Sequence, residues 1–242
     1  MFSWQWLPLL VAPFIGSFLG VLVRRLPEGR PVVLARSVCE ACGTTLGPAE
    51  MFPILSYLLQ RGRCRTCAAP VAPFHWQIEL AATAVTAWAL WADPERLWAD
   101  CAFGWTLLAL AWIDATSFRL PDALTLPLIL AGLAEAWWQD PALATDRALA
   151  AAFGYAAFRG VALAYRRWRG RDGMGEGDAK LLAALGAWVG VEGLAPTVLG
   201  AAALGIGAAT WLRLRGRRIT ATTALPFGPC LAAAGWLVRL YA

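Results

Sequence analysis

Long apolar runs recur along the chain and are separated by short polar connections. About 20 apolar residues in helical conformation span the hydrocarbon core of a bilayer. Runs of about this length predict eight membrane-spanning helices, at 6–23, 76–92, 97–113, 122–139, 147–165, 178–192, 195–212 and 223–240. The sixth run is short because the sequence GVEGLAP predicts a tight turn after it. The expected fold is therefore an all-α polytopic membrane protein with about eight transmembrane helices.

Only one connection is long enough to form a small domain. It covers residues 24–75 and is rich in proline, glycine and arginine. The pattern therefore predicts three parts, namely a first transmembrane helix at 1–23, a loop domain at 24–75 and a transmembrane core at 76–242.

Composition and charge agree with a membrane protein. Hydrophobic residues make up 59% of the 242 residues and charged residues only 15%, whereas soluble domains are about 25% charged. The net charge of +5 would suggest a nucleic-acid partner for a soluble protein. Here 16 of the 21 Lys and Arg residues fall in connections on one side of the predicted membrane, at 24–75, 114–121, 166–177 and 213–222. That asymmetry marks this side as cytoplasmic and removes the argument for nucleic acid.

Two C-x-x-C pairs stand out in the long loop. Cys39 and Cys42 form the first pair, Cys64 and Cys67 form the second, and 21 residues separate them. Four thiolates at this spacing suit a tetrahedral structural zinc site, which would fold a loop without a core of its own. A redox dithiol and unmetallated thiols remain alternatives, whereas lasting disulfides are disfavoured in the cytoplasm. Gly43 and Gly62 are expected to allow the tight turns of two metal-binding knuckles.

Two aspartates lie at span ends on the predicted cytoplasmic side. Asp114 closes the third span in WIDATSFRLPD, and Asp178 opens the sixth in GMGEGDAKLL. Ionisable groups at such positions are costly and usually functional. Two carboxylates at one depth could share a proton, as aspartic protease chemistry requires. The helix dipole favours Asp178 as the carboxylate and Asp114 as the acid, although Glu176 opposes this. A plain N-cap at Asp178, or an ion-transporting carboxylate pair, would explain the same positions without catalysis.

Four other charged residues near the spans have competing interpretations. Asp122 is expected to cap the fourth span or to support catalysis. Glu79 is expected to pair with an arginine, and Glu135 to be solvated. Lys180 would either neutralise the aspartates or extend towards lipid headgroups.

Several motifs, in order along the chain, resemble the type IV prepilin leader peptidases, which are G-x-G-D membrane aspartic proteases. They are GSFLGVLVRRLP, RSVCEACG, RGRCRTC, IDATSFRLPDALTLP, GMGEGDAKLLAALGAWVG and PFGPCLAAAGW. The resemblance implies that Asp114 and Asp178 are the catalytic pair and that the core is an aspartic peptidase. It also implies zinc in the cysteine loop and a location in the bacterial inner membrane, in contact with membrane lipid.

The resemblance also implies substrates and a second activity. The substrates would be type IV prepilins or type II secretion pseudopilins, whose basic leader is cut at the cytoplasmic face. Many members then methylate the new N-terminus with S-adenosylmethionine. The chain departs from the usual pattern at Gly20, Glu40, Met51 and Phe52. These positions lie in the third of the chain that the resemblance associates with methylation. A non-enzymatic assembly factor that docks through the cysteine loop is the remaining rival.

Overall fold

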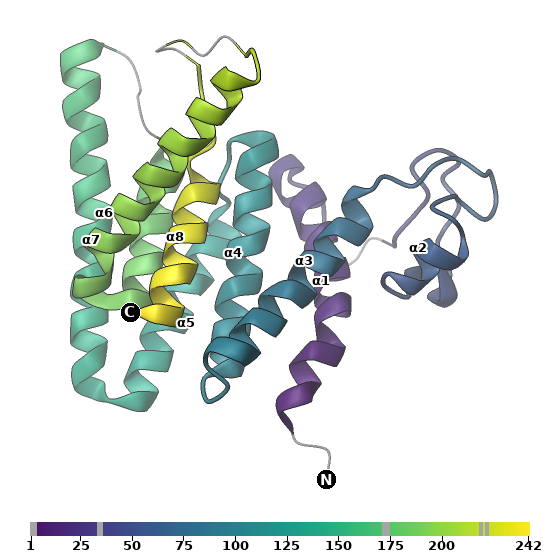
Figure 1. Ribbon diagram of the computed structural model, residues 1–242, viewed down its shortest axis with the longest axis horizontal. Helices are drawn as coiled ribbons and strands as arrows, with labels where there is room; N and C mark the ends of the chain where they lie inside the picture. Colours follow the sequence, from purple (N-terminus) through teal and green to yellow (C-terminus); the bar gives the residue numbers. More distant parts are fainter. Residues whose placement is uncertain (1–3, 33–35, 171–174, 218–219, 221–222) are drawn as a thin grey trace. The chain divides into compact units, whose positions relative to one another are not determined.

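The computed structural model describes residues 4–32, 36–170, 175–217, 220 and 223–242, and this part of the chain is helical (Figure 1). Two isolated β-bridges in the cysteine loop are the β-structure among the described residues. The expected all-α class is therefore confirmed. The helices are α1 (Leu7–Arg25), α2 (Leu55–Leu59), α3 (Phe74–Ala92), α4 (Leu97–Ser117), α5 (Asp122–Gln139), α6 (Pro141–Arg169), α7 (Glu176–Leu214) and α8 (Gly228–Tyr241).

The helices overlap the predicted apolar runs, but α6 begins before the run at 147–165, and the run at 223–240 is helical only in α8, which has 14 residues. The sixth and seventh runs lie in a single element, α7, which breaks at Gly190. Gly190 has φ 77° and ψ −177°, a conformation that glycine adopts without a Cβ penalty. It is the first residue of the predicted turn. Within the described residues, three helical stretches could cross a membrane by length and composition, namely Trp4–Glu28, Pro141–Arg169 and Glu176–Leu214. The count of eight spans stays a prediction.

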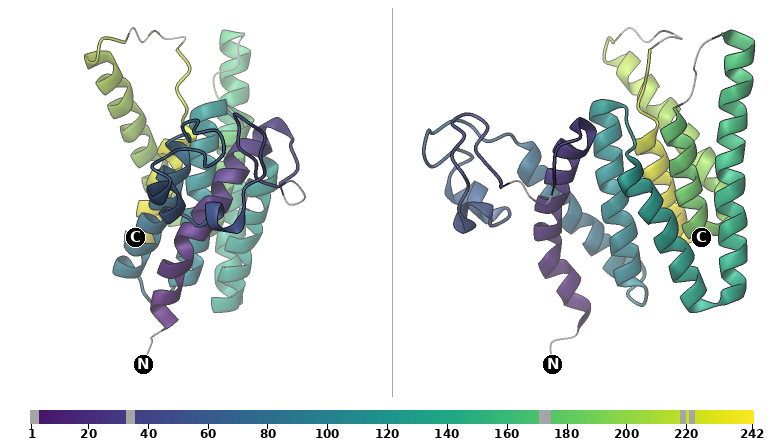
Figure 2. Two further views of the ribbon diagram at one scale, coloured as in Figure 1. Left: turned by 90° about the vertical axis from the view of Figure 1, so that its right-hand side faces the viewer. Right: turned by 180° about the vertical axis from the view of Figure 1, so that it is seen from behind.

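The chain forms two compact units, Met1–Ala109 and Leu110–Ala242. In the first unit α1 packs against α3, as both views of Figure 2 show. A Cβ on Gly16 would lie 2.5 Å from Glu79 Cα, so the two backbones approach as closely as small residues allow. The start of α4 joins them because Trp105 Nε1 donates to Ala82 O at 3.2 Å and to Thr86 Oγ1 at 3.1 Å.

In the second unit the first half of α7 is the central element. Nearly all of its side chains from Ala179 to Trp188 are buried, and α5, α6 and α8 pack against it. Small residues make this packing close: a Cβ on Gly186 would lie 2.7 Å from the Ala150 backbone, and one on Gly132 would lie 2.7 Å from Trp188. A helix enclosed on so many sides holds its first turn, which contains Asp178, in a fixed position.

An ion pair secures the other end of this half-helix. Arg239 Nη2 lies 2.8 Å from Glu135 Oε1, and its guanidinium stands over the Trp188 ring at 5.3 Å. The Arg239 side chain is 3% exposed and that of Glu135 is 16% exposed, so the expectation that Glu135 is solvated was wrong. Burial makes the pair costly to break, since loss of one partner leaves an uncompensated charge. The pair therefore fixes α5 and α8 against α7.

Candidate active site and cysteine cluster

Asp114 is a buried carboxylate near the end of α4. It is 5% exposed, and its Oδ2 accepts a hydrogen bond of 2.8 Å from the backbone N–H of Gly228, the first residue of α8. A Cβ on Gly228 would lie 2.7 Å from Asp114 Oδ2. Position 228 therefore has to be glycine for the backbone to reach the carboxylate. Sequence reasoning missed this residue, although the turn-forming pattern PFGPC before an apolar run could have indicated it.

Asp178 is the third residue of α7 and accepts a backbone hydrogen bond from Gly175. Its carboxylate lies near enough to Asp114 for the two charges to repel each other. The second unit therefore brings together two aspartates that are 64 residues apart in the sequence. Residues 173 and 174 of the opening G-x-G pattern lie outside the described residues.

Gly177 explains part of the glycine pattern before Asp178. A Cβ at this position would lie 2.9 Å from Leu120 Cβ. Leu120 belongs to the short link between α4 and α5, in which Phe118 has a positive φ of 53° and donates its N–H to Asp114 O at 2.9 Å. The link that follows one aspartate therefore packs directly on the backbone beside the other.

A second contact joins the same two segments. Lys180 Nζ lies 2.7 Å from Asp122 Oδ1 and 3.0 Å from Oδ2, so the amino group binds both carboxylate oxygens. Pro121 is the N-cap of α5 and no side chain caps this helix, so the expectation that Asp122 is a cap was wrong. Lys180 pairs with Asp122 instead of taking either role expected for it. Lys180 is two residues from Asp178, so this pair holds the start of α5 to the start of α7.

The four loop cysteines form one cluster in the first unit. Their Sγ atoms all lie within 4.8 Å of one another, and the Cys39 and Cys67 sulfurs are 3.9 Å apart. Zinc–sulfur bonds of about 2.3 Å in a tetrahedron give sulfur–sulfur edges of about 3.8 Å. The spacing of the donors therefore fits a tetrahedral metal ion. Hydrogen bonds with Thr44 lower the pKa of the Cys42 thiol to about 6, whereas hydrogen bonds with the other cysteines and desolvation raise the pKa of Cys67 to about 11. The cluster therefore favours the thiolate that a metal binds at Cys42, and a metal ion would have to displace the proton at Cys67.

The two cysteine pairs adopt the same turn. Gly43 N donates to Cys39 O and Ala68 N donates to Cys64 O, each at 2.9 Å. Both donors have a positive φ, 70° at Gly43 and 58° at Ala68. The expected glycine turn is thus present in the first knuckle, while an alanine takes the equivalent position in the second. A non-glycine residue in the left-handed backbone conformation loses about 1 kcal/mol of stability. The interactions that close the second knuckle have to offset that loss.

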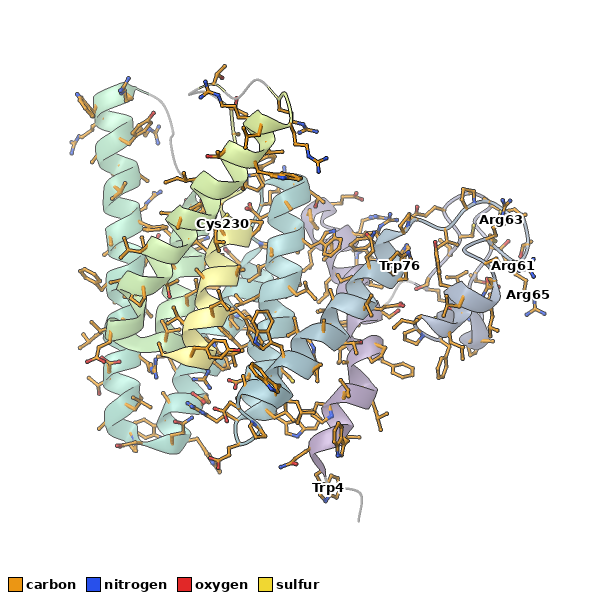
Figure 3. The ribbon with its side chains drawn as sticks, in the orientation of Figure 1. Trp4, Arg61, Arg63, Arg65, Trp76 and Cys230 are labelled. Atoms are coloured by element: carbon orange, nitrogen blue, oxygen red, sulfur yellow. The ribbon has the colours of Figure 1, made fainter. Side chains whose placement is uncertain are left out.

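A cavity of about 540 Å³ opens between the end of α1, the cysteine loop and the start of α3. Tyr57 and Trp76 place two aromatic rings on its wall, with centroids 6.2 Å apart, and Arg24 adds a cation. Figure 3 labels Trp76 at the start of α3. Sequence reasoning missed these residues as a set, because they come from three segments that only the fold brings together.

Glu79 also borders this cavity, but it does not pair with an arginine as expected. It is 7% exposed, and its Oε2 accepts the backbone N–H of Ile54 at 2.7 Å. That expectation was wrong because the carboxylate accepts a hydrogen bond from a backbone N–H of the cysteine loop instead. The lone Cys101 is buried, as expected for a small apolar side chain, and Cys230 is half-buried.

Two family models match the chain. The bacterial Peptidase A24 N-terminal domain matches residues 10–92, and the Type IV leader peptidase family matches residues 101–210.

Curated relatives match over most of the chain. Three of them, each named prepilin leader peptidase/N-methyltransferase, come from different bacteria. The protein of Burkholderia pseudomallei strain 1026b is 40% identical over 91% of this chain and 80% of its own length. Those of Pseudomonas aeruginosa PAO1 and Aeromonas hydrophila are 34% and 35% identical over 96% of this chain and 89% of theirs.

No solved structure shows significant similarity to the chain. The family models and the relatives agree with each other and together cover the loop, both aspartates and most of the helices. The chain belongs to the type IV leader peptidase family.

Proposed function

We propose that this chain is a membrane aspartic endopeptidase and N-methyltransferase. It removes the basic leader from type IV prepilins or type II secretion pseudopilins and then methylates the new N-terminus. The observation that carries the proposal is the approach of Asp114 and Asp178 at the ends of α4 and α7. The names of the relatives support both activities. A transporter or a non-enzymatic assembly factor is not favoured by any of those names.

The two carboxylates would act as one unit during cleavage. One accepts a proton from water, and the resulting hydroxide attacks the scissile carbonyl. The other donates a proton to the carbonyl oxygen, and collapse of the tetrahedral intermediate expels the amine, which takes up a proton. The backbone N–H groups of Gly228 and Gly175 orient the aspartates, one group on each. The dipole argument for Asp178 as the carboxylate stays a prediction.

We place the active site at the cytoplasmic face of the inner membrane. In the predicted topology the basic connections lie on the side of the membrane where α4 ends and α7 begins, and such asymmetry marks the cytoplasm. The cysteine loop follows Arg24 and Arg25 on this same side of the predicted topology. A leader that stays in the cytoplasm would meet the two aspartates there.

The cysteine cluster would hold a structural Zn²⁺ through Cys39, Cys42, Cys64 and Cys67. Four thiolates leave no open coordination position, so the ion would fold the loop and would take no part in cleavage. The methyl donor, S-adenosylmethionine, would bind in the cavity between α1, the loop and α3. Aromatic rings suit its adenine and its sulfonium cation, and Arg24, which pairs with Glu40 on the same wall, would exchange that partner for the carboxylate of the donor.

Replacement of either aspartate by asparagine should abolish cleavage. Asp114→Asn and Asp178→Asn each keep the shape of the side chain and remove its ability to exchange a proton. Incubation of membranes with a prepilin, followed by a gel shift, should show no mature product from either variant. Unchanged thermal stability in detergent is the control for folding. Wild-type cleavage by either variant would contradict the proposal.

Loss of the Lys180–Asp122 pair should slow cleavage without loosening the fold. Exposed pairs contribute about 0.2–1 kcal/mol to stability, so Lys180→Met should barely change the melting temperature. We expect kcat to fall about tenfold because the aspartate-bearing segments lose their alignment, with little change in KM.

The control for that experiment is Arg167→Gln, which removes an exposed charge in the last turn of α6 and should leave the rate within about twofold of wild type. The exchanged pair Lys180→Asp with Asp122→Lys should recover much of the rate. A rate unaffected by Lys180→Met would show that the pair has no part in positioning.

Loss of a cysteine ligand should release zinc and destabilise the first unit. Cys39→Ser should lower the zinc content measured by mass spectrometry from about one ion per chain to near zero. Cys101→Ser is the matched control, since Cys101 lies outside the cluster. Ala68→Gly should keep the metal and raise the stability of the loop by about 1 kcal/mol, because it relieves the positive φ. Wild-type protein purified without metal would refute the zinc site.

Trp76→Ala should weaken binding of the methyl donor and leave cleavage intact. Removal of one ring from the cavity should raise the Kd of S-adenosylmethionine, measured by calorimetry, about tenfold. Trp91→Ala, an exposed tryptophan at the far end of α3, is the matched control. Unchanged affinity in Trp76→Ala would place the donor elsewhere.

A further inference from the structure

An apolar segment of the cysteine loop lacks a protein partner on much of its surface. Residues 51–59 contain α2, and their large side chains stay substantially exposed. Leu58 is 65% and Leu59 is 74% exposed. The other exposed members of this segment are Met51, Phe52 and Leu55. Exposed apolar side chains gathered in so few residues mark an interaction surface.

A ring contact within the first unit fixes the depth of this surface. The Phe52 ring meets Phe14 edge to face, with centroids 5.2 Å apart. Phe14 lies in α1, ten residues before Arg24, which corresponds to about 15 Å along a helix. Half of a hydrocarbon core is also about 15 Å thick. With α1 spanning a membrane, as its length and composition allow, Phe52 would lie at the level of the acyl chains.

The backbone of the segment is adapted to an environment without water. Ile54 has a φ of 58°, a conformation that β-branched residues rarely adopt, and it reverses the chain just before α2. Its N–H donates to the buried Glu79 Oε2 at 2.7 Å. An N–H without a partner is expensive in hydrocarbon, whereas water would satisfy it at an ordinary surface. The buried Glu79 carboxylate on α3 therefore provides a hydrogen-bond acceptor for this N–H, which lipid cannot do.

Positive charge follows the segment directly. Arg61, Arg63 and Arg65 are exposed and extend from the loop near α2 (Figure 3). Arginine side chains beside an apolar surface reach towards anionic headgroups, which attract each positive charge. The surface thus combines an acyl-facing part with a phosphate-facing rim, which is the pattern of interfacial membrane segments.

We propose that residues 51–59 enter the bilayer leaflet next to Arg24 and Arg25 as a short re-entrant segment, packed on α1, with Arg61, Arg63 and Arg65 at anionic lipid headgroups. The partner is the bilayer itself. The cysteine cluster is thereby anchored at the membrane surface at a third point, in addition to α1 and α3. This inference depends on the fold of the first unit and stands whether or not the proposed activity is correct.

Photo-cross-linking of the full chain tests the proposal. A benzophenone amino acid is placed at Leu58 or Leu59, and the protein is reconstituted in vesicles of phosphatidylglycerol and phosphatidylethanolamine. The control position is Thr45, which is exposed in the first cysteine knuckle. We expect at least ten times more lipid adduct at 58 and 59 than at 45. Equal lipid labelling at all three positions, or adducts mainly with a second protein copy, would overturn the proposal.

Hydrogen exchange provides a second test that does not depend on labelling. Glu79→Ala should displace the turn at Ile54 from the bilayer into water and so raise its amide exchange at least tenfold in the same vesicles, while Glu79→Gln, which keeps an acceptor oxygen, should preserve protection. Protection that survives Glu79→Ala would overturn the proposed role of this carboxylate in holding the segment in the bilayer. Fast exchange at Ile54 in the wild-type protein would show that the segment lies in water.

Discussion

Two carboxyl groups held at one site are the constraint on which the second unit depends. Asp114 and Asp178 would repel each other if both were ionised, so rigid surroundings have to hold them together. Backbone N–H groups, such as that of Gly228, donate hydrogen bonds directly to the carboxylates. The first half of α7 is enclosed on nearly all sides, and its glycines allow neighbouring backbones to come close. A loosely packed bundle would let the aspartates separate.

In the first unit, polar groups have to order a loop that has no hydrophobic core and lies beside apolar helices. Two features can stabilise this loop. The cysteine sulfurs converge at a spacing suited to one ion, and Glu79 fixes the backbone turn at Ile54. The cavity beside them is lined by residues of α1, the loop and α3.

Much of this architecture was predictable from the sequence because apolar periodicity and cysteine spacing act locally. The runs anticipated the helices, and GVEGLAP anticipated the break at Gly190. The partners of single polar residues were not predictable in this way. Asp122, Glu79 and Glu135 find their partners on other elements, so a residue's position along its own helix does not determine what it contacts. Gly228 escaped notice because its contribution is a backbone N–H.

The central claim is that the two aspartates form one catalytic unit, and a double-mutant cycle tests it most directly. Single-turnover cleavage of one prepilin would be measured for wild type, Asp114→Asn, Asp178→Asn and the double variant. Groups that act as a unit lose their function together, so the double variant should be no slower than the slower single variant. Losses that multiply in the double variant would show that each aspartate contributes independently and would contradict the account.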